Sequence, residues 1–133
     1  MVRDTQEGKA RFDLLFAEHV PYKFQFLTRV AELLERGARK YGSRNWERAE
    51  SEEEMERFKA SAMRHLAQWV SGETDEDHAA AVVANLLFAE TTEFKRGRAA
   101  ATRVLTGEES CPSPHDVDCQ CFSCDWIRDH LLN

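Results

Sequence analysis

Apolar side chains recur at steps of three and four residues in several segments of the chain, and this spacing limits the fold more than any other feature. Between positions 24 and 41 they are Phe24, Leu27, Val30, Ala31, Leu34, Ala38 and Tyr41. Such steps return to one face of an α-helix, so the segment is predicted to form an amphipathic helix. Pro21 near its start and Gly42 just past its end suit helix termini.

A second helix is predicted to begin at Ser51-Glu52-Glu53-Glu54. This segment has the form of a capping box, in which the serine and the last glutamate satisfy each other's backbone amides. Gly72 predicts an end near Val70. The apolar face of this helix is expected to comprise Met55, Phe58, Ala62, Leu66 and Trp69.

A third helix is predicted from Asp75 to about Lys95. Thr74 offers a cap, and the acids that follow it suit the positive end of a helix dipole. The helix is expected to continue toward Leu105, with Gly97 as a candidate break.

The same patterns predict an all-α fold, a compact helical bundle. No stretch alternates apolar and polar residues over a useful length, and no internal repeat is present. Phe12 to Phe16 is expected to be a helical turn that packs on the bundle. We assign residues 1–107 to one helical domain and residues 108–133 to a cysteine-rich appendage that ends in a short helix, Asp125 to Leu132.

Charge and hydropathy indicate which classes of partner the protein is expected to bind. The net charge is −6, so affinity for duplex nucleic acid is not expected. No apolar run approaches bilayer length and the first eight residues are polar, which predicts a cytoplasmic protein without membrane contact. Positive charge is concentrated in one stretch, which suits a small polyanion such as a nucleotide: Arg36, Arg39, Lys40, Arg44 and Arg48.

Two histidines are expected to face the interior. His78 shares a stripe of the third helix with Asn85 among neighbouring alanines, and His65 borders the apolar face of the second helix. Neutral imidazole binds metals and serves as an acid or base near neutral pH. The alternative is that these side chains are core polar groups with satisfied hydrogen bonds.

Carboxylates offer a second kind of site. Glu32 and Glu35, three residues apart on the first helix, can share a hard cation such as Mg²⁺. The alternative is a solvated helical face on which they pair with Arg36 or Arg39. The acids at 75, 76 and 77 are interpreted as caps first and ligands second, and Glu73 can join them.

The segment from Arg39 to Trp46 combines cations, an amide, a glycine and two aromatic rings just beyond a helix. Cations hold phosphates and an aromatic face stacks on a base, so the segment is a candidate nucleotide-binding loop. The alternative is a helix cap with an aromatic anchor.

The cysteine-rich appendage is interpreted as a structural zinc site. Four cysteines lie within residues 111–124, and thiolates in a reducing compartment are more often metal ligands than disulfide partners. Free thiols are the alternative. The proposed zinc ligands are Cys119, Cys121 and Cys124, with Cys111 as the fourth and His115 or His130 as alternatives to it.

Four segments together resemble the phage dATP/dGTP diphosphohydrolase N-terminal domain family, over roughly residues 8 to 95. They are Lys9-Ala10-Arg11-Phe12-Asp13-Leu14, Gly37-Ala38-Arg39-Lys40-Tyr41-Gly42-Ser43-Arg44-Asn45-Trp46, Arg64-His65-Leu66, and Gly72-Glu73 through His78 to Asn85. The resemblance implies an all-helical fold related to MazG-like nucleotide pyrophosphohydrolases. It also implies metal-dependent hydrolysis of a nucleoside triphosphate, dGTP or dATP, to the monophosphate and pyrophosphate in phage nucleotide metabolism.

The resemblance also implies roles for single residues. For catalysis they are Glu35, His65 and His78. For a Mg²⁺ or Mn²⁺ ion they are Glu32, Glu35 and Asp77. For substrate binding they are Lys9, Arg11, Arg39, Lys40, Arg44, Asn45, Trp46 and Asn85. The sequence departs from the pattern at Ala81, where many relatives have a second histidine, and Glu73, Asp75 and Asp77 compete for one acidic pair.

A nucleoside triphosphate pyrophosphohydrolase is therefore the leading hypothesis. The first alternative is a non-enzymatic nucleotide- or protein-binding module whose zinc appendage docks a partner. A structural dimer is the second. In each case a homo-oligomer, dimer or tetramer, is expected, because short amphipathic helices leave apolar edges that a second copy can cover.

Overall fold

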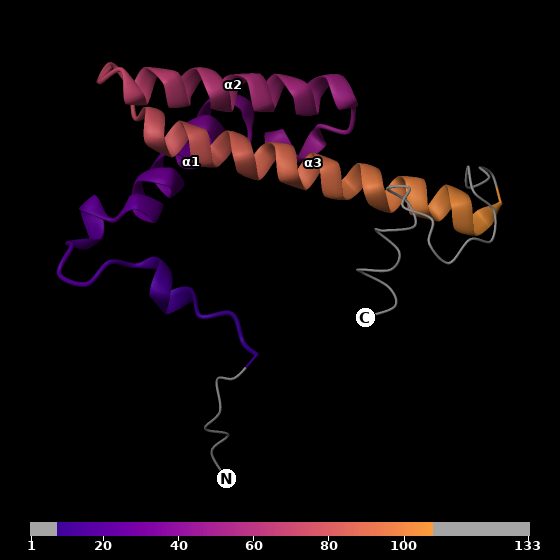
Figure 1. Ribbon diagram of the computed structural model, residues 1–133, viewed down its shortest axis with the longest axis horizontal. Helices are drawn as coiled ribbons and strands as arrows, with labels where there is room; N and C mark the ends of the chain where they lie inside the picture. The colour runs from indigo at the N-terminus through magenta and orange to yellow at the C-terminus, as the bar shows by residue number, and fades with distance from the viewer. Residues whose placement is uncertain (1–7, 108–133) are drawn as a thin grey trace, which may run out of the picture. The chain divides into compact units, whose positions relative to one another are not determined.

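The computed structural model describes residues 8–107, and every regular element in this range is helical (Figure 1). The elements are the 3₁₀ turns η1 (Phe12–Leu15), η2 (Tyr22–Phe24) and η3 (Asn45–Arg48) and the helices α1 (Phe26–Tyr41), α2 (Glu52–Val70) and α3 (His78–Thr106). The prediction of an all-α fold is confirmed. No helix within the described range is long and apolar enough to cross a membrane.

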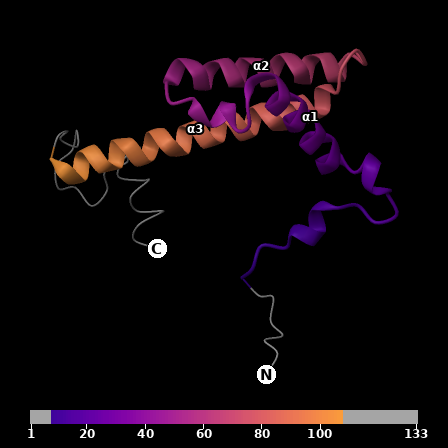
Figure 2. The ribbon, with the colours of Figure 1, turned by 180° about the vertical axis from the view of Figure 1, so that it is seen from behind.

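The described residues divide into two units, and helices α2 and α3 each contribute to both. The first unit holds residues 8–45 and Ala62–Ala84, which include α1, the end of α2 and the start of α3. The second holds Trp46–Ser61 and residues 85–107. Figures 1 and 2, seen from opposite sides, show α1 beside the first turns of α3 in the first unit.

Helix α1 begins at Phe26, two residues later than the spacing predicts. The chain after Pro21 forms the 3₁₀ turn η2, and the buried side chain of Gln25 then binds the preceding segment. Its amide nitrogen donates to the carbonyls of Ala17 and Val20 at 2.7 and 2.8 Å. The predicted end is confirmed, because Gly42 has a φ of 94° and donates its amide to the Ala38 carbonyl at 2.9 Å.

The predicted capping box of α2 is present. The Glu54 amide donates to the Ser51 hydroxyl at 3.1 Å, and the Glu54 carboxylate accepts from the amides of Ser51 and Glu50 at 3.1 and 3.0 Å. The helix ends at Val70 as predicted. Its predicted apolar face is only partly covered, because Met55 and Ala62 are buried whereas Leu66 and Trp69 are exposed.

Helix α3 begins at His78, three residues after the predicted start. Asp77 is its cap, since its carboxylate accepts the Ala80 amide at 3.1 Å. The helix runs through Gly97 to Thr106, so the expected continuation toward Leu105 is confirmed and the candidate break at Gly97 is absent. The alanine-rich start is the most completely buried part of the first unit, with Ala80, Ala81 and Ala84 at 0 to 5% exposure.

An ion pair joins α1 to the cap of α3. The Arg29 guanidinium donates to both carboxylate oxygens of Asp77, at 2.7 and 2.9 Å. Both side chains are partly buried, and the pKa of Asp77 lies below its usual value chiefly because of this hydrogen bonding. A bidentate pair of this kind is stronger than a single contact between exposed charges.

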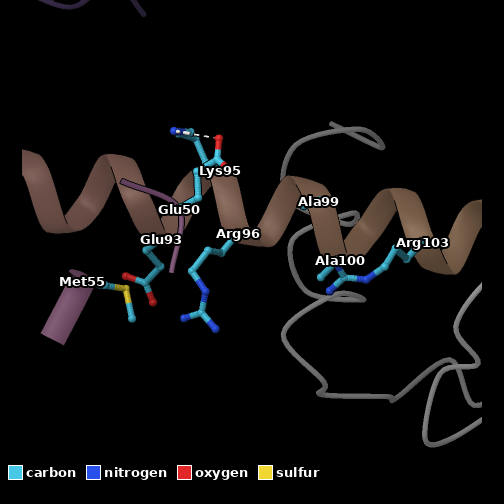
Figure 3. Close-up of a pocket in the computed structure, with 8 residues that line it drawn as sticks. All are labelled: Glu50, Met55, Glu93, Lys95, Arg96, Ala99, Ala100 and Arg103. Atoms are coloured by element: carbon cyan, nitrogen blue, oxygen red, sulfur yellow. Dashed lines mark ion pairs between the residues drawn. The ribbon is translucent and has the colours of Figure 1, made fainter. Parts of the chain in front are cut away.

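In the second unit, aromatic and basic side chains fasten α3 to η3 and to the start of α2. Trp46 stacks on Phe88 with ring centroids 4.9 Å apart, and Phe58 meets Phe88 edge-on at 5.3 Å. The Lys95 amine donates to the carbonyls of Glu47 and Ala49. Lys95 and its ion-pair partner Glu50 are among the residues that line a pocket of about 610 Å³ on this unit (Figure 3).

The segment from Phe12 to Phe16 forms the predicted helical turn but does not pack on a bundle. Phe12 and Leu14 are each 72% exposed, and their neighbours Leu15 and Phe16 are about half exposed. The prediction of packing is wrong for the single chain, because no described element covers this turn.

Replacing Arg29 should weaken the first unit. We expect Arg29→Gln to lower the free energy of unfolding by about 1 kcal/mol, because a charged hydrogen-bond pair is lost from a partly buried site. Arg39→Gln is the matched control: Arg39 lies on the same helix and pairs with the exposed Glu35, so a loss of only about 0.3 kcal/mol is expected. Urea unfolding measures both, and equal losses would contradict the assignment.

The capping box predicts an acid-sensitive contribution to stability. Hydrogen bonds from the amides of Glu50 and Ser51 lower the pKa of Glu54 from about 4.5 to about 2. A lowered pKa in the folded state stabilises the fold above pH 4.5, and this stabilisation is lost as pH falls toward 2. Glu54→Gln keeps an acceptor but cannot titrate, so urea unfolding should show a shallower loss of stability over this range than in the wild type. Parallel profiles would contradict this explanation.

Candidate functional site

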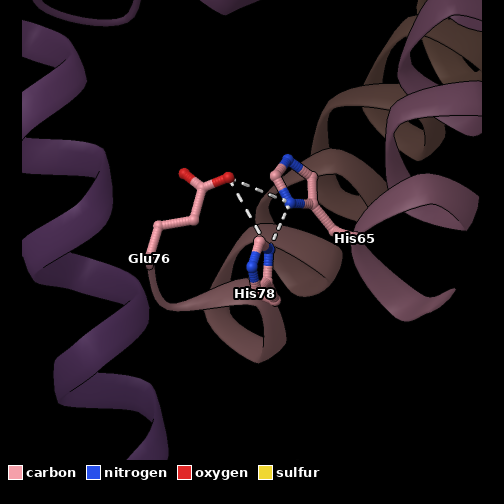
Figure 4. Close-up of side chains that lie close together, drawn as sticks. All are labelled: His65, Glu76 and His78. Atoms are coloured by element: carbon pink, nitrogen blue, oxygen red, sulfur yellow. Dashed lines mark hydrogen bonds and ion pairs between the residues drawn. The ribbon is translucent and has the colours of Figure 1, made fainter. Parts of the chain in front are cut away.

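Two buried histidine rings meet in the first unit. His65 of α2 and His78 of α3 are 8% and 1% exposed, and their Nδ1 atoms lie 3.0 Å apart (Figure 4). The prediction that both rings face the interior is confirmed. A buried polar group without a hydrogen-bond partner is costly, and the contact between the two rings gives the Nδ1 atom of each ring a partner.

A tight turn after α2 brings the rings together. Gly72, at a φ of 81°, donates its amide to the Trp69 carbonyl at 3.1 Å, and the next amide, of Glu73, donates to the Gln68 carbonyl at 3.0 Å. This bond pattern is a Schellman motif, in which glycine supplies the left-handed residue. The chain therefore reverses within a few residues, and the Asp77 cap starts α3 with His78 as its first residue.

Three carboxylates of this turn surround the rings. Asp75 Oδ1 lies 2.7 Å from His78 Nε2, and Glu73 Oε2 lies 3.9 Å from the same nitrogen. Glu76 Oε1 lies 3.5 Å from His65 Nδ1 and 3.6 Å from His78 Nδ1 (Figure 4). The hydrogen bond from His78 lowers the pKa of Asp75, so this carboxylate stays ionised.

Hydrogen-bond chemistry decides where the protons lie. An ionised carboxylate only accepts, so the Nε2 atom of His78 donates to Asp75. When both rings are neutral, the Nδ1 atom of His78 is then a lone pair, and the Nδ1 atom of His65 donates to it. The remaining lone pair is on His65 Nε2, which lies 3.5 Å from a guanidinium nitrogen of Arg64. The three side chains thus form a hydrogen-bonded relay that ends in a basic nitrogen.

Two overlapping sets of side chains can hold a metal ion. Across residues 8–107, the groups of three potential ligands that lie close enough together are His65, Glu76 and His78, and Glu73, Asp75 and His78. The first set has two buried imidazoles and one carboxylate. The second relies on two exposed carboxylates around a single ring.

The residues predicted to hold Mg²⁺ or Mn²⁺ are not brought together. Neither ligand group contains Glu32, Glu35 or Asp77. Glu35 instead accepts from Arg39, which is the alternative proposed from the sequence, and Asp77 accepts from Arg29 and the Ala80 amide. In this arrangement the three carboxylates do not fit one shared ion, and a site at these positions stays a prediction.

The predicted substrate-binding residues of the first unit are exposed. Arg11 donates to Asp13 at 2.8 Å and Lys40 lies over the Tyr41 ring at 5.0 Å. Arg44 has a φ of 56°, a left-handed conformation at the turn after α1. All of these side chains lie at the surface of the unit: Lys9, Arg11, Arg39, Lys40, Arg44 and Asn45.

Trp46 and Asn85 belong to the second unit. The Trp46 ring is half-buried and stacked on Phe88, which fits the alternative of an aromatic anchor, and Asn85 is half-buried on α3. Base stacking by Trp46 stays a prediction. The predicted zinc ligands Cys111, Cys119, Cys121 and Cys124, with His115 and His130, lie outside the described residues.

Two contributions to the site were missed from the sequence. Asp75 and Glu76 were interpreted as caps first and ligands second, whereas they are the carboxylates nearest to the histidines. The three-residue step from Asp75 to His78 was an available signal, because that spacing brings side chains together at a helix start. Arg29 carried no local signal, since its partner lies 48 residues away.

The fold and the site define a helical protein in which two buried histidines contact exposed carboxylates. A protein-family model described as dATP/dGTP diphosphohydrolase, N-terminal, matches residues 2–103, and the chain belongs to that family. The match contains the whole histidine cluster and the basic segment around Arg39. Searches of curated proteins and of solved structures found no match to this chain.

The relay predicts a fixed tautomer for each ring. Long-range ¹⁵N–¹H spectra of the histidines at alkaline pH should place the proton of His78 on Nε2 and that of His65 on Nδ1. Asp75→Ala should remove the preference at His78, because the acceptor is lost, and should leave the 95% exposed His19 unchanged. A proton on Nδ1 of His78 in the wild type would contradict the relay.

Proposed function

We propose that this protein hydrolyses dATP or dGTP to the monophosphate and pyrophosphate in a metal-dependent reaction, as part of phage nucleotide metabolism. The carrying observation is the Asp75–His78–His65 relay, in which the two histidines are buried and Asp75 is exposed, and which lies within the region that matches the family. An inert core would be expected to fill this position with apolar side chains, whereas the relay supplies a base whose orientation is set by two further groups.

His65 is the base of the proposed reaction. The oxygen of a water molecule bonds to the α-phosphorus, the bond from that phosphorus to the bridging oxygen breaks, and pyrophosphate leaves with the electron pair. The proton of the water passes to Nε2 of His65. Asp75, through His78, stabilises the resulting imidazolium, as the aspartate does in hydrolytic triads.

The basic segment at the end of α1 is proposed to hold the phosphates. The Glu35–Arg39 pair is exposed, and such pairs contribute only a few tenths of a kcal/mol. A triphosphate can therefore displace Glu35 from Arg39 at little cost. Lys40 is exposed in the same segment and Arg64 lies beside the proposed base.

The metal requirement follows from the charge of the substrate. A triphosphate carries several negative charges, and Mg²⁺ or Mn²⁺ neutralises phosphate oxygens during their transfer. Glu32 and Glu35 remain the proposed ligands, and displacement of Glu35 from Arg39 would make its carboxylate available.

We also propose that the protein forms a homo-oligomer, either a dimer or a tetramer. The second half of α2 exposes Met63, Leu66, Trp69 and Val70, each by 46% or more. An apolar surface of this kind is typical of a face that another chain covers.

Pyrophosphate release tests the function. The four deoxynucleoside triphosphates are supplied with Mg²⁺ or Mn²⁺, and we expect dATP or dGTP to give the monophosphate and pyrophosphate. His65→Gln should lower kcat by about a hundredfold or more, because a general base is removed. His19→Gln is the matched control, since His19 is exposed and distant in sequence from the relay, and its activity should equal that of the wild type.

Each negative result contradicts a different part of the proposed function. Full activity of His65→Gln would contradict the assignment of the base, and full activity of Glu35→Ala would contradict the carboxylate ligand. Nucleotide binding without turnover of any substrate would contradict the enzyme and favour the binding module.

A further inference from the structure

We propose that His65, Glu76 and His78 bind one divalent transition-metal ion, with zinc as the best-suited element. The three ligand atoms are Nδ1 of each ring and Oε1 of Glu76, separated by 3.0, 3.5 and 3.6 Å. These separations admit one point about 2.0 Å from all three atoms, which is the bond length of zinc to imidazole nitrogen and carboxylate oxygen. The ligands can thus bind an ion with little rearrangement.

The surroundings of His78 match those of a metal ligand. A ligating histidine usually donates its other ring nitrogen to a carboxylate, which fixes the tautomer and makes the ligating nitrogen more basic. Asp75 does this at 2.7 Å from Nε2 of His78. Nδ1 of His78 therefore carries a lone pair that a metal ion can bind. His65 has the exposed Arg64 beside its Nε2 atom, and that side chain can turn toward solvent.

The ligand set selects the class of metal. Imidazole suits zinc and its neighbours in the first transition row, whereas Mg²⁺ prefers oxygen ligands alone. Three protein ligands leave a fourth position open, as in zinc sites that bind water or substrate. Glu76 is 53% exposed, so the ion can enter from its side. The set that contains Glu73 and Asp75 is the weaker candidate, because it contributes a single imidazole.

The ion and the proton shared by the two rings occupy the same place. A metal at the two Nδ1 atoms displaces that proton, so a chain holds one or the other. The site is thus a property of the chain apart from its proposed hydrolysis, and it can be tested without substrate. A failure to bind metal would leave the relay intact.

Cobalt is the probe, because Co²⁺ replaces zinc and absorbs visible light in a low-symmetry site. The four cysteines could also bind it, so we use the full-length chain with Cys111, Cys119, Cys121 and Cys124 replaced by serine. We expect one Co²⁺ per chain, visible absorption, no sulfur charge-transfer band in the near ultraviolet, and loss of the signal when Zn²⁺ is added. His65→Ala should abolish this signal, whereas the exposed-site control His19→Ala should keep it.

A substitution of the buried His65 can also misfold the chain, so two further variants change exposed residues instead. Glu76→Gln and Asp75→Ala should each weaken Co²⁺ binding about 10- to 100-fold, because one removes a charged ligand and the other the partner that orients His78. Circular dichroism should show wild-type helix content in both. Absence of a visible band in the cysteine-free chain, or equal affinity in all the variants, would overturn the site.

Discussion

The first unit depends on the hydrogen bonds that one group, the carboxylate of Asp77, accepts. It accepts two hydrogen bonds from Arg29 and one from the Ala80 amide, so a single group caps α3 and fastens α1 to it. Partial burial makes these charge-assisted bonds stronger than those of an exposed pair. His78 follows Asp77 directly, so the cap also fixes the backbone position from which the His78 side chain extends.

The turn that precedes this cap concentrates ionisable groups. Gly72 allows the chain to reverse, and Glu73, Asp75 and Glu76 then lie within reach of one buried ring. Burying two imidazoles without hydrogen-bond partners would be costly. Here the carboxylates and the contact between the rings provide partners for Nδ1 of both rings and for Nε2 of His78. A cluster of this kind can exchange a proton or bind a metal, and both chemistries suit a hydrolytic family.

Local signals predicted most of the helical structure. The capping box at Ser51, Gly42 and Gly72 act within a few residues, so their consequences could be derived without knowing the rest of the chain. The candidate break at Gly97 is absent because packing with distant residues, and not the local sequence, decides whether the helix continues there. A glycine costs a helix about 1 kcal/mol, and packing along α3, where this residue is buried, outweighs that cost. The exposed turn at Phe12 likewise shows that an apolar pattern identifies a face without identifying what covers it.

The sequence by itself determined the helical class, the C-terminal ends of α1 and α2 and the inward orientation of His65 and His78, because these follow from residue spacing and from backbone preferences. Tertiary structure alone decided which charges from distant parts of the chain meet. It paired Arg29 with Asp77 across 48 residues, placed Glu76 beside both rings, and left Glu32 outside either ligand group. Side chains on different helices come within reach only when the helices pack, and residue spacing along one chain does not encode that distance.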